Sequence, residues 1–211
     1  MLKVKIDDPS LVDKVWVTSD LHLGHKNISG PSRSSWKDGY RDFQNEVQMT
    51  EVLIGEINKY VPHDGILLNL GDLQFTSHKL IPENRARIAV KTWHHVLGNH
   101  DLSVTKYSSC FTSVADMIEL NYFGKMFILC HYPMRSWLGA GKGYYHLYGH
   151  EHDMFDRPPN QPWGKSMDVG IDSAYRLFGE YRPFNIKEVI SILDQRDILS
   201  LGHHTESCNV H

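Results

Sequence analysis

Three short runs of apolar, largely β-branched residues in the first half of the chain each end abruptly in a cluster of polar residues. The runs are KVWVTS (14–19), GILLNL (65–70) and TWHHVL (92–97). Runs of this length, bounded by glycine and polar residues, are typical of strands buried in a sheet. The pattern therefore predicts three central strands, each of which leads into a polar segment.

The segments between these strands are predicted to be helices and loops. Between residues 42 and 61 the apolar positions repeat at helical spacing, which predicts an amphipathic helix with one side toward the core. These positions are Phe43, Val47, Ile54, Ile57 and Val61. Residues 28–41 are rich in Gly, Ser, Pro and Arg, as loops are. Residues 80–91 favour a second helix, with Pro82 near its start.

The second half of the chain has a different pattern. The stretch ADMIELNYFGKMFILCHYP (115–133) is typical of two strands joined by a tight turn at FGK, which favours an antiparallel pair. YYHLYGH (144–150) and SMDVGIDSA (166–174) indicate two further strands. Residues 183–193 suggest a closing helix.

The overall composition suits one globular domain. The chain has 211 residues, of which 41% are hydrophobic and 22% charged. No repeat or low-complexity linker divides it, so we expect one layered α/β domain over residues 1–195 and a polar tail over 196–211. The first residues lack the apolar run of a secretory signal, and no segment approaches the roughly 20 apolar residues of a membrane span. Three scattered cysteines form no disulfide or metal motif, which favours a reducing cytoplasm.

The predicted strands deliver polar side chains of similar chemistry at their ends. These residues are Asp20, His22, Asp72, Asn99, His100, His131, His150 and His152. In sheet proteins, ligands and catalytic groups gather where strands end. If the strands lie side by side, we expect these residues to converge on one site.

Seven of these residues form a set of nitrogen and oxygen donors without thiolate, which suits Mn, Fe, Ni or Zn. Asp20 and His22 are two positions apart, as are His150 and His152, and in extended chain such pairs point to the same side. Seven ligands are too many for one ion but suit two, if one carboxylate bridges them. A two-metal site activates a hydroxide near neutral pH and clamps attacking and leaving oxygens, which serves phosphoester hydrolysis.

His100 is the residue left over from the donor set. A histidine close to the metals but not bound to them can protonate a leaving alkoxide, since its pKa range suits that task. The neighbouring Asp101 could orient this imidazole and favour its charged form. We therefore assign His100 as general acid and Asp101 as its partner.

The order of these motifs resembles the calcineurin-like metallophosphoesterases, and the resemblance spans residues 14 to about 194. The motifs are D-x-H (Asp20, His22), G-D (Gly71, Asp72), G-N-H-D (98–101), a histidine after a strand (His131) and G-H-x-H (149–152). Each motif alone is weak, whereas five in the right order are a strong signal. The resemblance implies a four-layer α-β-β-α sandwich of two mixed sheets flanked by helices.

The resemblance also implies roles for single residues. The first metal would be held by Asp20, His22, Asp72 and His152. The second metal would be held by Asp72, Asn99, His131 and His150, with Asp72 bridging. A metal-bridging hydroxide would attack phosphorus in line, with His100 as general acid supported by Asp101. Two divalent ions are implied as cofactors, with Mn first and Fe, Ni or Zn as alternatives.

Departures from the family pattern indicate which branch of the family the sequence resembles. GDLQFTSHK lacks the arginine that the Ser/Thr protein phosphatase branch carries after G-D, and G-N-H is followed by Asp and not Glu. Protein phosphatase activity is therefore disfavoured. SDLHLGHKNI, CHYPMRSW and VGID look more like the short single-domain phosphoesterases of bacteria and their phages.

Four further residues are candidates for substrate contact. They are His25, Arg33, Arg41 and Arg135. His25 shares a loop with His22, and arginines close to the site can grip phosphate bidentately. For each of them an ordinary place in a loop or on the surface is the alternative.

The substrate is expected to be a small phosphoester. A net charge of −3 offers no basic excess for long nucleic acid, which is disfavoured as a partner without being excluded. Our first hypothesis is a phosphodiesterase acting on a small nucleotide-like substrate, with a phosphomonoesterase close behind. A catalytically silent binding scaffold of the same fold is the third reading, and the oligomeric state stays open.

Overall fold

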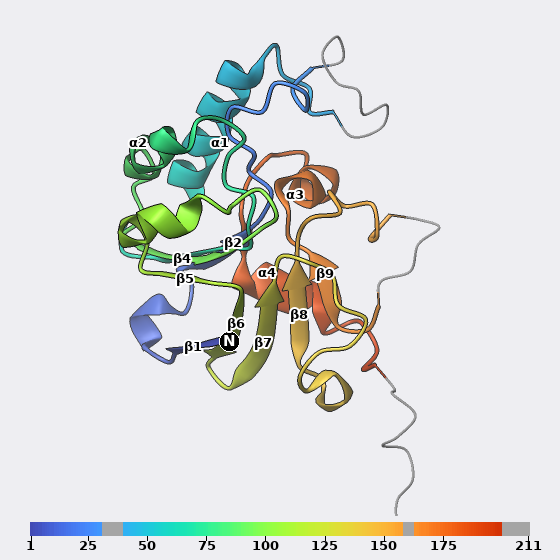
Figure 1. Cartoon of the computed structure of the whole chain (residues 1–211). Helices are drawn as coiled ribbons and strands as arrows, with labels where there is room; N and C mark the ends of the chain where they lie inside the picture. Colours follow the sequence, from blue (N-terminus) through green and yellow to red (C-terminus); the bar gives the residue numbers. More distant parts are fainter. Residues whose placement is uncertain (31–39, 158–162, 200–211) are drawn as a thin grey trace, which may run out of the picture.

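The computed structural model describes residues 1–30, 40–157 and 163–199, which fold into two five-stranded sheets with helices around them (Figure 1). The first sheet has the order β10 (Phe184–Asn185), β2 (Val15–Thr18), β3 (Ile66–Asn69), β4 (Thr92–Val96) and β5 (Ser113–Ala115). The second has the order β1 (Leu2–Ile6), β6 (Met117–Tyr122), β7 (Lys125–Cys130), β8 (Tyr145–Tyr148) and β9 (Ser166–Asp168). The helices are α1 (Glu46–Tyr60), α2 (Ile81–Ala86), α3 (Ile171–Phe178) and α4 (Ile186–Leu193).

Both sheets are mixed, as expected. In the first, β2, β3, β4 and β5 run parallel and β10 pairs antiparallel with β2. In the second, β1 is parallel to β6, β6 is antiparallel to β7, and β7, β8 and β9 are parallel. The carboxyl ends of β2, β3 and β4 therefore share one edge, and the ends of β7 and β8 share another. The predicted metal ligands directly follow these strand ends.

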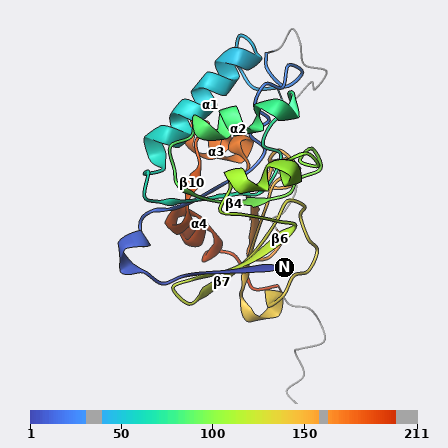
Figure 2. The ribbon, with the colours of Figure 1, turned by 60° about the vertical axis from the view of Figure 1, so that its left-hand side comes forward.

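The main hydrophobic core lies between the sheets. Inward-facing residues of β2 and β3, such as Val17 and Leu68, pack with Leu120 of β6, Phe127 of β7 and Leu147 of β8, all fully buried. Burial of each such side chain contributes about 1.5–3 kcal/mol. Helix α4 adds its apolar face to this core, and Figure 2 shows it at the side of the sandwich, at a level between the sheets.

A second apolar cluster covers the outer face of the first sheet. Leu53 and Ile57 of α1 pack there with Leu67 of β3 and Trp93 of β4. Figures 1 and 2 both place α1 and α2 on the side of this sheet that faces away from the second sheet. The described residues thus form two mixed sheets flanked by helices, as the resemblance implied. No helix in the described ranges is long and apolar enough to cross a membrane.

Several element boundaries differ from the sequence-based prediction. Helix α1 begins at Glu46, because the Asn45 side chain accepts hydrogen bonds from the amides of Val47 and Gln48 and caps it. Val47 was expected in the core but is 62% exposed, because it lies in the first turn on the solvent side.

Four other elements were missed or assigned wrongly. LKVKI at the N-terminus forms β1 and pairs with β6, and residues 113–115 form the edge strand β5. The strand predicted over 166–174 ends at Asp168, and the helix α3 follows from Ile171. The helix predicted over 80–91 is confined to Ile81–Ala86.

His146 on β8 is a buried polar residue of the outer face of the second sheet. Its Nδ1 lies 2.9 Å from the Ile128 carbonyl oxygen, and its Nε2 accepts from the Met134 amide at 3.0 Å. Both bonds require the neutral Nδ1–H tautomer, which is the assignment the network dictates. Burial lowers the pKa of His146 to about 4.

This low pKa predicts a stability loss in mild acid. Between the ordinary pKa near 6.5 and the folded value near 4, the unfolded chain binds the proton more readily, so stability falls as pH falls. The shift corresponds to about 3 kcal/mol, fully lost near pH 4. Urea unfolding of metal-free wild-type and His146→Gln protein at several pH values measures it. Wild type should lose its advantage over the variant between pH 6.5 and 4, whereas a constant difference would contradict this assignment.

Candidate metal centre

The structure brings the polar segments after β2, β3, β7 and β8 together at one buried point. Ligand atoms of Asp20, His22 and His152 lie within 4.8 Å of one another, and so do those of Asp20, Asp72 and His131. All five residues are buried. Buried carboxylates and imidazoles at this spacing are the donor set that divalent transition metals take.

Asp72 lies at the centre of the cluster. Its Oδ2 is 3.5 Å from His22 Nε2, 3.6 Å from His131 Nε2 and 4.0 Å from His100 Nε2. Its other oxygen accepts a hydrogen bond of 2.9 Å from the backbone amide of His100. One carboxylate oxygen therefore faces the predicted ligands His22 and His131 from two separate loops, as a bridging ligand would, with His100 slightly farther away.

Asn99 joins the remaining predicted donors. Its Oδ1 is 2.9 Å from His131 Nε2 and 3.0 Å from His150 Nδ1. The His150 backbone amide in turn donates to both oxygens of Asp20, at 3.1 and 3.0 Å. All seven predicted ligands thus lie in one continuous cluster of contacts.

Left-handed backbone is concentrated in this cluster. Five predicted ligands have positive φ, namely Asp20 (57°), His22 (48°), Asp72 (56°), His150 (72°) and His152 (48°). Each such conformation in a residue other than glycine costs on the order of 1 kcal/mol or more and persists where its surroundings enforce it. Here the amides of Asp20 and His22 donate to the carbonyl oxygens of Gly71 and Asp72, which locks the loops after β2 and β3 together.

The histidine rings are oriented by bonds on the side away from the cluster. His131 Nδ1 lies 2.8 Å from the Leu70 carbonyl oxygen, and His152 Nδ1 lies 2.8 Å from Asp172 Oδ2. Such bonds fix the ring and direct Nε2 toward a metal. The Leu70 carbonyl oxygen can only accept, so Nδ1 is the donor in this bond, while Nε2 faces Asn99 Oδ1 at 2.9 Å.

The chemistry of His22 tests whether a metal fits this site. Its ring is buried, and neither Nδ1 nor Nε2 has a hydrogen-bond partner within the described part of the chain. Burial, aided by the charges of His152 and Arg41, holds the pKa of His22 well below its usual range, so the ring is neutral. A buried unpaired lone pair costs about 1–3 kcal/mol, and a divalent cation removes that cost. Burial also raises the pKa of Asp72, because its negative charge is poorly solvated there. A bound cation would stabilise that charge.

Arg41 was predicted to contact substrate, and that prediction is wrong. The side chain is fully buried and donates to the carbonyl oxygens of Asp20 (2.5 Å) and Leu21 (2.9 Å). It also grips both oxygens of Asp172 at 2.8 Å. Burial alone would raise the pKa of Asp172, but the Arg41 guanidinium and the His152 bond hold that pKa far below its ordinary value. Arg41 and Asp172 thus position the loop of Asp20 and the ring of His152.

Asp101 was predicted to orient His100, and this is also wrong. Its carboxylate lies 2.9 Å from His95 Nε2 and accepts from the amides of Asp72 (2.7 Å), Leu73 (3.1 Å) and Gly98 (3.0 Å). The carboxylate is buried, its bonds run to His95 of β4 and to backbone amides after β3 and β4, and none of these bonds involves the His100 ring. Asp101 therefore holds the backbone of Asp72 in place.

His100 and His25 meet at an aromatic residue that the sequence did not single out. The His25 ring stacks on Phe75 at 4.0 Å between centroids, and the His100 ring meets Phe75 edge-on at 4.8 Å. Burial lowers the pKa of His25 to about 4, so this ring is a neutral group near pH 7. The His100 side chain is 38% exposed and lines a cavity of about 170 Å³. Phe75 thus fixes His100 at the rim of the cluster, where a substrate can reach it.

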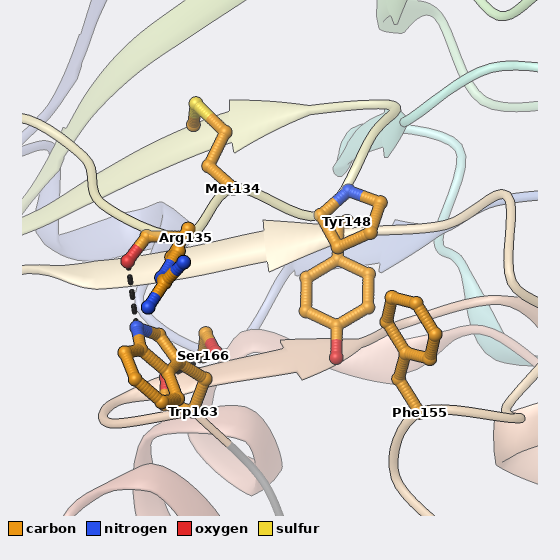
Figure 3. Close-up of a pocket in the computed structure, with 7 residues that line it drawn as sticks. Met134, Arg135, Tyr148, Phe155, Trp163 and Ser166 are labelled. Atoms are coloured by element: carbon orange, nitrogen blue, oxygen red, sulfur yellow. Dashed lines mark hydrogen bonds between the residues drawn. The ribbon is translucent and has the colours of Figure 1, made fainter.

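The remaining two predicted substrate contacts are Arg33 and Arg135. Arg33 lies outside the described residues. Arg135 lines a separate cavity of about 380 Å³ whose walls include Tyr148, Phe155 and Trp163 (Figure 3). There the Trp163 indole donates to the Arg135 carbonyl oxygen at 2.6 Å, and the guanidinium lies 5.8 Å from the indole centroid.

Glycines in two motifs allow the ligands to approach one another. A Cβ at Gly149 would collide with Ser19 Oγ and Asp20 Oδ2, and one at Gly98 would collide with the side chain of Asp72. The glycines of G-H-x-H and G-N-H-D are therefore required by close packing against the two aspartates.

Gly149→Ala is expected to weaken metal binding about 10- to 100-fold, because the new methyl displaces Asp20. Calorimetric titration with Mn²⁺ measures the change. Gly55→Ala is the matched control, since a Cβ there meets nothing within 4 Å and lies inside α1. The control should bind Mn²⁺ as wild type does and gain roughly 0.5–1 kcal/mol in stability. Wild-type affinity in Gly149→Ala would show that Asp20 does not depend on this glycine.

Comparison with known proteins adds a family and a fold. A family model described as calcineurin-like phosphoesterase matches residues 13–205. No curated protein matches the chain. Among solved structures, a protein of unknown function from Aquifex aeolicus, AQ665, is similar with a TM-score of 0.61 and 17% identity, covering 84% of this chain and 98% of that one. At this identity the solved structure supports the fold alone.

Proposed function

Because the chain belongs to the calcineurin-like phosphoesterase family, we propose that it hydrolyses phosphodiesters of small nucleotide-like molecules with the aid of two divalent metal ions. The observation that carries this proposal is the position of Asp72. Its Oδ2 faces His22 and His131 at 3.5 and 3.6 Å, so one carboxylate oxygen is shared between two sets of donors. In two-metal phosphoesterase sites the ions lie about 3.5–4 Å apart, a spacing that one shared carboxylate can span.

The two metal sites divide the seven donors between them. Asp20, His22, Asp72 and His152 would hold the first ion, and Asp72, Asn99, His131 and His150 the second. When bound, a divalent pair supplies Lewis acidity for the phosphoryl oxygens and lowers the pKa of an attacking water. The all-nitrogen-and-oxygen set suits Mn first, with Fe, Ni or Zn as alternatives.

His100 is proposed as the proton donor to the leaving oxygen. Its Nε2 lies 4.0 Å from Asp72 Oδ2, and its ring is partly exposed at the rim of the cluster. The amide of the same residue donates to Asp72 at 2.9 Å, so a direct hydrogen bond ties the backbone of the acid to the carboxylate. An exposed, positioned imidazole of this kind can give a proton to an alkoxide and regain it from water.

Preference for a diester is supported by the space around the cluster. His100 lines one cavity of about 170 Å³, and His152 lines another of about 260 Å³. A phosphodiester carries a substituent on each of two ester oxygens, and two cavities give both substituents a place. A monoester would use only one of them.

The direct test compares bis(4-nitrophenyl) phosphate with 4-nitrophenyl phosphate in the presence of Mn²⁺. We expect kcat/KM to be higher for the diester. A clear preference for the monoester would make the protein a phosphatase. Absence of hydrolysis across mono-, di- and cyclic phosphoesters in a protein that holds two ions would favour a binding scaffold.

A further inference from the structure

The cavity beside His152 is bordered by two arginines that the sequence did not single out. Its walls include the two arginines Arg157 and Arg176, the carboxylates of Asp42 and Asp172, and the rings of His152, Tyr175 and Tyr181. The cavity measures about 260 Å³, large enough for a phosphate group and part of a small organic molecule. The cavity therefore adjoins the candidate metal centre through His152, which belongs to both.

Both arginines are held by one buried carboxylate. Arg157 Nε and Arg176 Nε donate to the same oxygen of Asp153, at 2.9 and 2.5 Å. The Asp153 side chain is fully buried, and its other oxygen accepts from Ser173 Oγ at 2.9 Å. Each guanidinium is thus fixed through Nε, and no described residue accepts a hydrogen bond from its terminal nitrogens.

Asp153 is the ion-pair partner that both guanidinium groups share, while Asp156 and Asp168 attract Arg176 at longer range. Two guanidinium groups share one carboxylate, so the trio carries a net charge of about +1 at neutral pH. Their side chains are 36% and 35% exposed, with the terminal nitrogens as the parts not used by Asp153. Paired guanidinium forks are the groups that bind a phosphate dianion most specifically.

The positions of Asp153 and Arg176 along the chain limit the distance between the arginine pair and the metal centre. Asp153 directly follows His152, and both have left-handed backbone (φ 72° and 48°). Asp172, which orients His152, is four residues before Arg176 on α3, so the two lie on the same face about 6 Å apart. A phosphate on the arginines would therefore lie within the span of one small molecule from a phosphorus at the metals.

We propose that Arg157 and Arg176 bind a second phosphate group of the substrate. The substrate is then a small phosphoester that carries an additional phosphate, and the pair selects it over the same ester without that group. This inference rests on the proposed function, since it assumes that the ester to be cleaved lies at the metal centre. The stacked rings of Tyr175 and Tyr181, 4.2 Å apart, offer a flat wall for the part between the phosphates.

The test uses two chromogenic diesters that differ in one group. These are the 4-nitrophenyl ester of thymidine 5′-phosphate and the same ester with a 3′-phosphate, assayed with the Mn²⁺-loaded full chain. We expect wild type to prefer the doubly phosphorylated ester at least tenfold in kcat/KM, mainly through KM. Arg157→Gln and Arg176→Gln should each reduce this preference about tenfold, and Arg176→Lys should retain part of it.

A matched control variant and a binding assay separate failure of the arginine site from failure of the proposed function. Arg87→Gln should keep the preference, because Arg87 is similarly exposed (34%) and pairs with Glu51 of α1 at 2.7 Å. No preference in wild type, or an unchanged preference in both glutamine variants, would overturn the proposal. If neither ester is cleaved, the proposed function fails. Calorimetric titration with thymidine 3′,5′-bisphosphate then tests the arginine site on its own. Wild type should then still bind at least tenfold more tightly than Arg176→Gln, and equal affinities would refute the site.

Discussion

Replacing Asp72 with asparagine is expected to lower kcat by on the order of 10³-fold or more and to remove both metal ions together. The carboxylate oxygen that faces His22 and His131 at 3.5 and 3.6 Å becomes a neutral amide that bridges cations poorly. The loss of both ions removes several kcal/mol of transition-state stabilisation, and each 1.4 kcal/mol is a factor of ten in rate.

Elemental analysis of the dialysed protein measures the metal loss directly. Asp64→Asn is the control, because Asp64 is an exposed carboxylate that pairs with Lys14 at 2.6 Å, remote from the predicted ligands. This control should keep two ions per chain and full activity. Loss of a single ion from Asp72→Asn would mean that Asp72 serves one metal only and that the bridge is assigned to the wrong residue.

Replacing His100 with asparagine is expected to leave both ions in place and to lower kcat about 10²- to 10⁴-fold for substrates with an alkoxide leaving group. The backbone amide of residue 100 still donates to Asp72 in the variant, so the centre keeps its geometry. The loss should shrink for 4-nitrophenyl esters, because 4-nitrophenolate leaves without a proton.

The dependence on the leaving group separates proton donation from a structural effect. His63→Asn is the control, since His63 is exposed between α1 and β3 and should show wild-type rates with both kinds of ester. Equal losses for alkoxide and nitrophenolate esters would point to a role in binding. Full activity of His100→Asn on an alkoxide ester would remove His100 from the mechanism.

The ligand cluster was predictable from sequence because of a simple geometric rule. Parallel strands that are neighbours in a sheet end at one edge, so residues just past β2, β3 and β4 must meet wherever those strands pair. Asp20, Asp72 and Asn99 follow this rule, and apolar periodicity alone identified the three strands. The donors therefore converge without any knowledge of side-chain direction.

The errors arose where a role depends on side-chain direction or on distant pairing. Arg41 pairs with Asp172, which lies 131 positions away, and no local pattern links the two. Asp101 is next to His100 in sequence, yet its carboxylate points to His95 and to the loop after β3. Adjacent residues in a tight turn face different ways, so adjacency was a poor guide to partnership.

The pairing of Arg157 and Arg176 could not be predicted from the sequence for the same reason. Arg157 and Arg176 belong to a loop and to α3, and only the buried carboxylate of Asp153 brings them to one point. The left-handed backbone at five predicted ligands was also beyond sequence reasoning, because Asp and His tolerate that conformation without requiring it.

The central claim is that two divalent ions share the carboxylate of Asp72. Crystals of the protein grown with Mn²⁺ and measured near the manganese absorption edge test it most directly. We predict two anomalous peaks per chain, both in contact with Asp72, one beside His22 and His152 and the other beside Asn99, His131 and His150. A single peak, or two peaks of which only one touches Asp72, would contradict the account.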